Sequence, residues 1–253
     1  MTPNRFLSDL KAMSAPTTDP AEIAKFSALA AEWWNPRGPF GALHRLNPIR
    51  LRFIRDLVAE RLERRGARPL AGIDALDLGC GGGLVSAPLA RMGAVVTAID
   101  ASEEAIGAAR AYAEQAGLEI KFECTTAEAL VARGAQFTLV TALEIVEHVA
   151  DVGAFLGAAQ ELVKPGGLLV LSTINRTAKA RALAITGAER ILKWAPEGAH
   201  DFEKLVTPEE IRSGAPELHW DQPVGVVYKP LGQGWSLSHD VDVNYMMAGR
   251  RSA

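Results

Sequence analysis

The sequence predicts an α/β fold with a mostly parallel central sheet and helices on both of its faces. From residue 73 to residue 174, short apolar runs alternate with stretches of helical periodicity, and this alternation is typical of consecutive βαβ units. A glycine-rich loop directly follows the first apolar run, at the place where open α/β sheets bind nucleotides. The length of 253 residues suits a single domain of this class.

We expect this domain to follow a flexible tail formed by residues 1–18 and to span residues 19–253. Its expected parts are N-terminal helices (19–70), an α/β core (73–174), a lid or insertion (175–206) and C-terminal strands (207–253).

The first helix is predicted to begin at Asp19, which would cap it, with Pro20 in the first helical position and Glu22 completing the cap. Apolar residues at helical spacing extend this helix to about residue 34. A second helix is expected over residues 48–65.

The core elements follow from the alternation of apolar runs and helical patterns. The expected strands are 73–79, 94–100, 119–124, 137–142 and 168–174, and the expected helices are 84–92, 103–115, a short one near residue 128, and 154–163. Beyond them, residues 176–195 have the spacing of an amphipathic helix with a basic face. Strands are expected again over residues 224–228 and 234–238.

Composition and charge exclude several classes of protein. Hydrophobic residues make up 48% of the chain, which excludes disorder as the dominant state. The net charge is −3, and no basic stripe interleaved with aromatic residues occurs apart from the arginines between residues 45 and 68, so we expect no nucleic-acid partner. With two cysteines, no signal peptide and no apolar run long enough to cross a membrane, a cytoplasmic location is expected.

The loop from Asp77 to Gly83 carries the clearest functional signal. Its glycines allow a sharp turn and a close approach of the backbone to a ligand. The dinucleotide fingerprint would require a third glycine where Leu84 stands, which argues against a nicotinamide-dependent dehydrogenase. Asp100 ends the next strand, where it would accept hydrogen bonds from a ribose. Alternatively, Asp100 caps the following helix, although Ser102 is also suited to that role.

A second polar cluster, Glu144, Glu147 and His148, follows the fourth strand at the same edge of the sheet. On a helical turn these side chains would share one face and would bind a hard cation such as Mg²⁺. Alternatively, His148 is a general base, or the cluster is a solvated helix start. Of the two cysteines, Cys80 is interpreted as a small residue in a tight loop and Cys124 as the end of a buried strand.

The pattern of Asp77 followed by glycines at alternate positions resembles the first motif of class I methyltransferases that use S-adenosylmethionine. Further segments resemble the UbiG family, the bifunctional O-methyltransferases of ubiquinone biosynthesis. The most specific is the stretch with the tryptophan pair and the pattern H-R-x-N-P-x-R-L, and the segments are 25–51, 147–149, 172–176, 198–201 and 242–246.

The resemblance implies a Rossmann-like class I methyltransferase fold with an N-terminal helical extension and an inserted helical lid. It implies methyl transfer from S-adenosyl-L-methionine to phenol hydroxyls of polyprenyl-substituted precursors, a 2-polyprenyl-6-hydroxyphenol and a 3-demethylubiquinol. By motif position the residues expected at the cofactor are Arg50, Asp77, Gly79, Gly81, Asp100 and Leu143. The expected catalytic residues, which are also the expected Mg²⁺ ligands, are Glu144, Glu147 and His148.

Because such substrates live in lipid, residues 176–195 are expected either to form a lid or to lie on a membrane surface, which would make the enzyme peripheral at the inner face of the membrane. A ubiquinone-biosynthesis enzyme assembly is a further expected partner. Two other functions stay open at this point: a class I methyltransferase acting on another small molecule, such as an amine, and a catalytically silent cofactor-binding scaffold.

Overall fold

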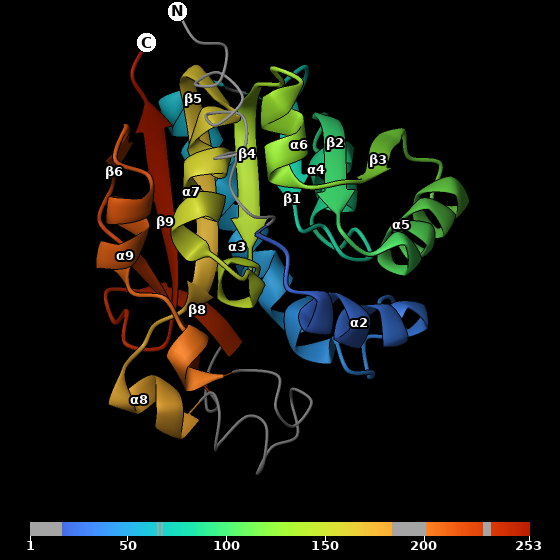
Figure 1. The fold of residues 1–253 in the computed structure, drawn as a ribbon. Coiled ribbons are helices and arrows are strands. Elements are labelled where there is room, and N and C mark those ends of the chain that lie inside the picture. The colour runs from blue at the N-terminus through green and yellow to red at the C-terminus, as the bar shows by residue number, and fades with distance from the viewer. Residues whose placement is uncertain (1–16, 65, 67, 184–200, 230–233) are drawn as a thin grey trace, which may run out of the picture.

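The fold is built on one twisted sheet, which Figure 1 shows running through the centre of the molecule. The computed structural model describes residues 17–64, 66, 68–183, 201–229 and 234–253. Among these residues the strand order is β3-β2-β1-β4-β5-β9-β7-β8, with β6 beside β9. The strands are β1 Asp74–Leu78, β2 Val95–Asp100, β3 Ile120–Cys124, β4 Phe137–Leu143, β5 Val163–Ile174, β6 Leu218–Trp220, β7 Val224–Lys229, β8 Gly234–Ser238 and β9 Asn244–Arg251.

The first five strands are parallel and confirm the predicted α/β core. The helices that connect them are α4 Ser86–Arg91, α5 Glu103–Gln115, α6 Ala127–Ala132 and α7 Val152–Glu161. Because each strand returns to the same edge, the carboxyl ends of β1, β2 and β4 lie together, and the loops that follow them can form a common site.

Helices cover both faces of the sheet, and the alternation of side chains along β1 shows how. Ala75 packs with α3, α4 and α5, whereas the next residue, Leu76, packs with α6, α7 and α9. Both faces are therefore buried, which explains why the core strands read as nearly continuous apolar runs. In Figure 1, α6 and α7 lie in front of the sheet and α3 lies behind it.

The carboxyl-terminal strand β9 was not predicted. It is antiparallel and lies between β5 and β7, and its residues from Tyr245 to Ala248 are almost completely buried. The Tyr245 hydroxyl donates to the carbonyl of Val206 at 2.7 Å, so the buried polar atom is satisfied. The predicted strands 224–228 and 234–238 are confirmed as β7 and β8.

The N-terminal helices differ from the prediction in their limits. The first is α2 (Pro20–Ala28), followed by a short 3-10 turn, η1 (Ala30–Glu32), and the second is α3 (Gly41–Arg61). Asp19 caps α2 as expected, since its side chain accepts from Ala21 N at 2.9 Å. The expectation that Glu22 completes this cap is wrong, because its carboxylate instead contacts His148.

Two further expectations need correction. Cys124 does not end a buried strand, because β3 is the edge strand of the sheet and Cys124 is exposed. The predicted helix over residues 176–195 is described only as far as residue 183, with α8 at Ala178–Ala180, and its remainder lies outside the described residues, as does nearly all of the predicted tail. The chain then continues through η4 (Phe202–Lys204) and α9 (Pro208–Gly214). None of the described helices is long and apolar enough to cross a membrane.

Candidate active site

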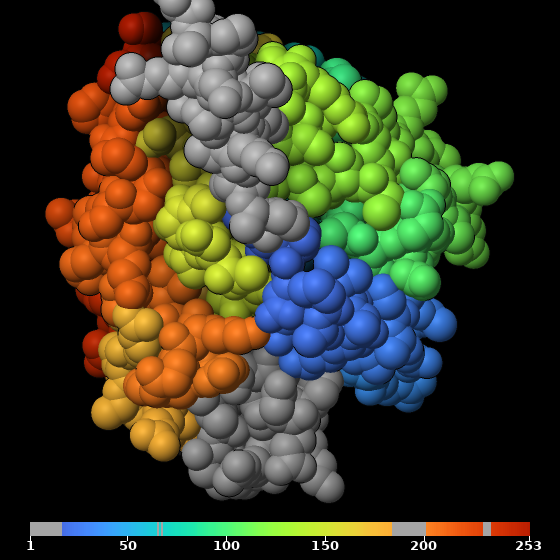
Figure 2. Space-filling model, in the orientation of Figure 1, coloured from blue at the N-terminus to red at the C-terminus, as the bar shows by residue number. Residues whose placement is uncertain are grey.

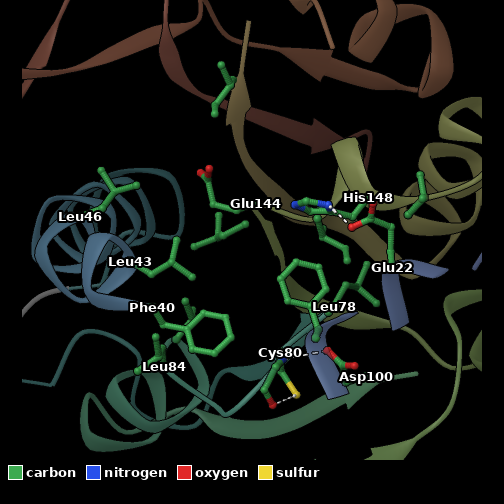
Figure 3. A pocket seen from close by; sticks show the side chains of 18 of the residues that line it. Glu22, Phe40, Leu43, Leu46, Leu78, Cys80, Leu84, Asp100, Glu144 and His148 are labelled. Carbon is green, nitrogen blue, oxygen red and sulfur yellow. Dashed lines mark hydrogen bonds and ion pairs between the residues drawn. The ribbon is translucent and has the colours of Figure 1, made fainter. Parts of the chain in front are cut away.

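A pocket of about 740 Å³ lies at the carboxyl ends of β1, β2 and β4. Eight of the nine predicted site residues line this pocket, and the exception is Glu147. Figure 3 shows Glu144 and His148 along one side of this pocket, Asp100 on another, and the apolar side chains of Phe40, Leu43 and Leu46 facing them. The N-terminal helices therefore form one wall of the pocket, and the carboxyl edge of the sheet forms the opposite wall.

The glycine loop has the left-handed backbone that its sequence predicts. Gly79, Gly81 and Gly83 have φ angles of 65°, 50° and 84°, a region that residues with a Cβ rarely adopt. A Cβ at Gly79 would lie 2.6 Å from the Ile145 side chain, and one at Gly81 would lie 2.4 Å from the ring of Trp33. The absence of a Cβ at these glycines therefore lets Ile145 and Trp33 pack directly against the loop at the wall of the pocket.

Asp77 anchors the start of this loop through buried hydrogen bonds. Its buried carboxylate accepts from Ser86 Oγ at 2.6 Å and from Thr141 Oγ1 at 2.8 Å, which ties the loop to α4 and to β4. Burial raises the pKa of Asp77 to about 6, although these two hydrogen bonds and nearby Arg50 oppose the shift. The structure therefore shows Asp77 supporting the loop, and its direct contact with the cofactor stays a prediction.

Asp100 stands at the end of β2 in the position suited to a ribose. Its two oxygens accept from the backbone N–H of Gly81 at 2.8 Å and of Ser102 at 2.9 Å, and each oxygen keeps a lone pair for a further donor. Burial raises the pKa of Asp100, against the effect of those backbone bonds. The alternative that Asp100 caps α5 is wrong, because Ser102 is the capping residue and accepts from Ala105 N at 3.1 Å.

Arg50 is almost fully buried on α3 and faces the same pocket. One terminal nitrogen donates to Asn47 Oδ1 at 3.1 Å, and the other lies 3.7 Å from Glu144 Oε1. Asn47 in turn donates to the carbonyl of Leu84 at 2.6 Å. Within the described part of the chain, Arg50 Nε has no hydrogen-bond partner.

These residues fit S-adenosylmethionine. A buried guanidinium with an unpartnered N–H suits the carboxylate of the methionine moiety. The glycines add no side chain of their own to the pocket wall, and Asp100 can accept from ribose hydroxyls. Leu143, at the end of β4, adds an apolar contact on the pocket wall.

The segment after β4 places its three polar side chains in three different surroundings. Glu144 has a φ of 54°, an unusual value for a residue other than glycine, and strain of this kind is concentrated at functional sites. Its carboxylate accepts from Ser172 Oγ at 2.6 Å. Glu147, in the 3-10 turn η2 (Val146–His148), is 3% exposed and neither of its oxygens has a hydrogen-bond partner among the described residues. Burial, together with the charge of Glu144, raises the pKa of Glu147, so its neutral form is favoured.

The expectation that Glu144, Glu147 and His148 share one face of a helical turn is therefore wrong. His148 turns toward α2, where Nδ1 lies 3.0 Å from Glu22 Oε2 and the ring meets the edge of Phe26 at 5.0 Å. In the part of the chain that the structure describes, no three acidic, histidine or cysteine side chains are grouped as metal ligands. These residues do not fit a resident Mg²⁺ ion as they are placed.

Comparison with known proteins agrees with the geometry of the pocket. The profile of a family described as "Methyltransferase domain" matches residues 76–171. A ubiquinone biosynthesis O-methyltransferase from Rhizobium leguminosarum bv. trifolii (strain WSM2304) is 50% identical over 241 residues, which cover 94% of this chain and 96% of the relative. The chain belongs to the ubiquinone biosynthesis O-methyltransferases. A second member, from Caulobacter sp. (strain K31), is 51% identical over 90% of this chain and 93% of its own length.

Solved structures support the fold of this methyltransferase. Magnesium protoporphyrin IX methyltransferase (ChlM) from Synechocystis PCC 6803, with bound SAH, matches 90% of the chain and 95% of its own with a TM-score of 0.61 at 20% identity. The same protein with bound SAM matches with a TM-score of 0.54 at 19% identity. The predicted class I methyltransferase fold, the O-methyltransferase activity of ubiquinone biosynthesis and the use of S-adenosylmethionine are thereby confirmed.

Several residues that line the methyltransferase's pocket or hold its lining residues were not predicted from the sequence. Asn47 belongs to the same motif as Arg50, and its place one helical turn before Arg50 was a usable signal. Trp33 and Ile145 pack on the glycine loop from two distant segments. The contact between Glu22 and His148 had no such signal, because an acidic residue near the start of a helix is ordinarily explained by capping.

Proposed function

We propose that this methyltransferase transfers a methyl group to phenol hydroxyls of polyprenyl-substituted ubiquinone precursors, in both O-methylation steps of the pathway. The observation that carries the proposal is a single pocket whose wall combines two kinds of residue. Arg50, the glycine loop and Asp100 suit the cofactor, and apolar residues such as Leu43, Val226 and Trp235 suit an apolar acceptor. The names of the relatives support the substrate class.

The rim of the pocket supports a long apolar substituent on the substrate. Among the described residues, three large hydrophobic side chains are strongly exposed, and two of them, Leu183 at 54% and Tyr228 at 40%, line this pocket. Exposed apolar side chains gathered at a pocket mark a place where an apolar ligand can cover them. The polyprenyl chain would leave the pocket between these two residues.

In this reaction the protein's residues remove the proton of the phenol and align the phenol oxygen with the methyl group. Bound S-adenosylmethionine supplies an electrophilic methyl group on its sulfonium. His148 accepts the proton of the phenol, whose pKa is about 10 in water, and the oxygen forms its bond to the methyl carbon as the carbon–sulfur bond breaks. The pocket walls hold the oxygen in line with that bond. Glu144 lines the pocket together with His148, whereas Glu147 is not among the residues of its wall, and no step requires a metal ion.

Residues 176–195 are part of the same proposal as a lid that also contacts the membrane surface. Of this segment, the described residues include three basic side chains, Arg176, Lys179 and Arg181, and the exposed apolar side chain of Leu183. Arg176 is ion-paired with Glu210, and Lys179 with Asp240 and Asp242, so the positive charge of these two is partly balanced within the protein. Anionic lipid and a basic amphipathic segment attract each other. Flotation with anionic vesicles tests this point, since a variant lacking 176–195 that floats as well as the full chain would contradict it. Association with other enzymes of ubiquinone biosynthesis is proposed for the same location.

The decisive experiment is methyl transfer to a short-chain demethylubiquinol analogue and to a 2-prenyl-6-hydroxyphenol, with and without a chelator. We expect both phenols to be methylated in the presence of chelator, and a catecholamine-type amine to remain unmethylated at nitrogen. His148→Ala should lose turnover while its affinity for S-adenosylhomocysteine stays within about twofold, because a base contributes to the reaction rather than to cofactor binding. A protein that binds the cofactor but methylates neither phenol would instead be a scaffold.

A further inference from the structure

We propose that Glu22 is a positioning residue for His148: its carboxylate fixes the proton on Nδ1 and thereby makes Nε2 the nitrogen that takes the proton from the phenol. The inference rests on the proposed function, in which His148 is the base. It adds a residue from the N-terminal helix α2 to a site otherwise built from the edge of the sheet. The pair is visible in Figure 3, where a dashed line joins the two side chains.

The contact is short and shielded from solvent. Nδ1 of His148 and Oε2 of Glu22 are 3.0 Å apart, and the two side chains are only 11% and 19% exposed. An exposed ion pair would contribute little, but a contact at this depth is weakly screened. One helical turn beyond Glu22, Phe26 meets the imidazole edge to face, with ring centroids 5.0 Å apart and planes at 85°. Two successive turns of α2 therefore hold the ring, one by a hydrogen bond and one by packing.

The chain before α2 fixes which side of this helix faces His148. Thr18 forms an antiparallel bridge with Val149, the residue after His148. The N–H of Ala150 donates to the carbonyl of Thr17 at 2.7 Å. Because these backbone contacts join the two segments within a few residues of both side chains, the approach of Glu22 to the imidazole is set by the fold and not by a flexible side chain alone.

Two lysine side chains also contact the carboxylate of Glu22. Lys204 Nζ lies 3.5 Å from Glu22 Oε1 and donates to Asp19 Oδ2 at 3.0 Å, so it joins η4 to the start of α2. Figure 2 shows this orange segment lying against the blue α2. Lys25 adds a second ammonium group, 3.7 Å from Oε2. Each oxygen of Glu22 thus has a cationic or N–H partner, which restricts rotation of the carboxylate.

The chemical consequence follows from what each group can donate. An ionised carboxylate only accepts hydrogen bonds, so the imidazole nitrogen that faces it must carry a proton. In the neutral ring the other nitrogen, Nε2, then holds the lone pair. A carboxylate that orients a catalytic histidine in this way also stabilises the imidazolium that forms when the proton is taken up. The proton passes from the phenol oxygen to Nε2, and then from Nε2 to solvent after methyl transfer.

The test compares Glu22→Gln with Glu32→Gln. Glutamine keeps the shape of glutamate, but its amide can donate as well as accept, so it no longer enforces the Nδ1–H tautomer. Glu32 provides a matched control, because it lies in the same N-terminal segment and accepts a hydrogen bond from the Asn35 side chain. For both variants and for His148→Ala, we would measure kcat and KM for the phenol, the Kd for S-adenosylhomocysteine, and the ¹⁵N chemical shifts of the His148 ring, assigned by their loss in His148→Ala.

We expect Glu22→Gln to lower kcat by about 10- to 100-fold, a part of what a general base contributes, with KM and Kd within about twofold and Glu32→Gln unchanged. The ¹⁵N spectrum of the unaltered protein should show Nδ1 protonated, and Glu22→Gln should shift the ring toward the other tautomer. Nε2 protonated in the unaltered protein, or a Glu22→Gln variant that changes only KM or Kd, would overturn the proposal and leave Glu22 as an anchor for α2.

The roles of His148 and Glu22 can be refuted separately. If His148→Ala retains full turnover, the base assigned in the proposed function is wrong, while the ¹⁵N measurement still decides whether Glu22 sets the tautomer. If His148→Ala is inactive and Glu22→Gln has the kcat of Glu32→Gln, His148 keeps its role and the positioning role of Glu22 is refuted.

Discussion

Replacing Arg50 by lysine should weaken binding of S-adenosylmethionine while preserving the fold. Lysine keeps the positive charge that faces Glu144, but it cannot retain both the hydrogen bond to Asn47 and the forked N–H groups with which we expect Arg50 to bind the carboxylate of the cofactor. Hydrogen bonds to charged groups contribute roughly 1.5–3 kcal/mol each. The loss of the forked contact should therefore cost about 3 kcal/mol, which corresponds to about 100-fold in Kd.

Calorimetry with two ligands makes this prediction specific. Decarboxylated S-adenosylmethionine lacks only the group that Arg50 is expected to bind, so the unaltered protein should bind it about 100-fold more weakly than the complete cofactor. Arg50→Lys should lose most of this discrimination. Arg52→Lys is the control, because Arg52 is exposed on α3 and should leave both affinities unchanged.

A variant that loses affinity for both ligands by the same factor would refute the reasoning. Arg50 would then act by holding α3 and the segment after β4 in place, and its buried guanidinium would have no role in recognising the carboxylate. Thermal unfolding of the ligand-free variant separates this outcome from a general loss of stability.

Three further predictions follow from the loop, its support and the rim of the pocket. Gly81→Ala should weaken cofactor binding and lower the unfolding free energy by about 2–5 kcal/mol in urea titrations, because Gly81 has a φ of 50° and a Cβ there would lie 2.4 Å from the ring of Trp33. The control Gly107→Ala, on α5 with open space around it, should stabilise the protein slightly. The pKa of Asp77 is raised from 3.8 to about 6, so the folded state binds this proton more tightly than the unfolded state. The resulting stabilisation is fully present below pH 4 and is lost, by about 3 kcal/mol, as the pH rises through 6. In urea titrations from pH 4 to pH 7, the unfolding free energy of Asp77→Asn should therefore depend less on pH than that of the unaltered protein. Tyr228→Ser should raise KM for a long-chain acceptor but not for a short-chain one in steady-state assays.

The parts of the fold that the sequence predicted are those decided by local signals. The helix expected over 103–115 is confirmed at both limits, because Ser102 caps it and its apolar residues keep a helical spacing. By contrast, α3 begins well before its expected start, because Pro48 was taken as a helix start and instead lies exposed inside the helix. Strand β9 escaped prediction because nothing in a short apolar run near the end of a chain indicates that it enters the middle of a sheet.

The same distinction explains the site. Gly79, Asp100 and Glu144 could be placed together because they follow parallel strands, whose carboxyl ends meet at one edge. The surroundings of each side chain could not be predicted, because they depend on partners brought in by other elements. Glu147 shows this: one residue before His148 in the chain, it is buried without a hydrogen-bond partner, while His148 reaches Glu22.

The balance of charge around Arg50 explains both the raised pKa values near it and the kind of ligand that the pocket suits. Three acidic groups, Asp77, Glu144 and Glu147, surround the buried guanidinium of Arg50, and they are the charges that act on it most strongly. One cation does not balance them, so burial raises the pKa of Asp77 and of Glu147. The cofactor carries the complementary set of charges, a sulfonium and an ammonium group beside one carboxylate. Even with Glu147 neutral, the carboxyl groups of Asp77, Asp100 and Glu144 outnumber the guanidinium of Arg50 in the pocket wall, which favours a ligand of net positive charge. We expect the unpartnered N–H of Arg50 to fix the end at which the carboxylate of the cofactor lies.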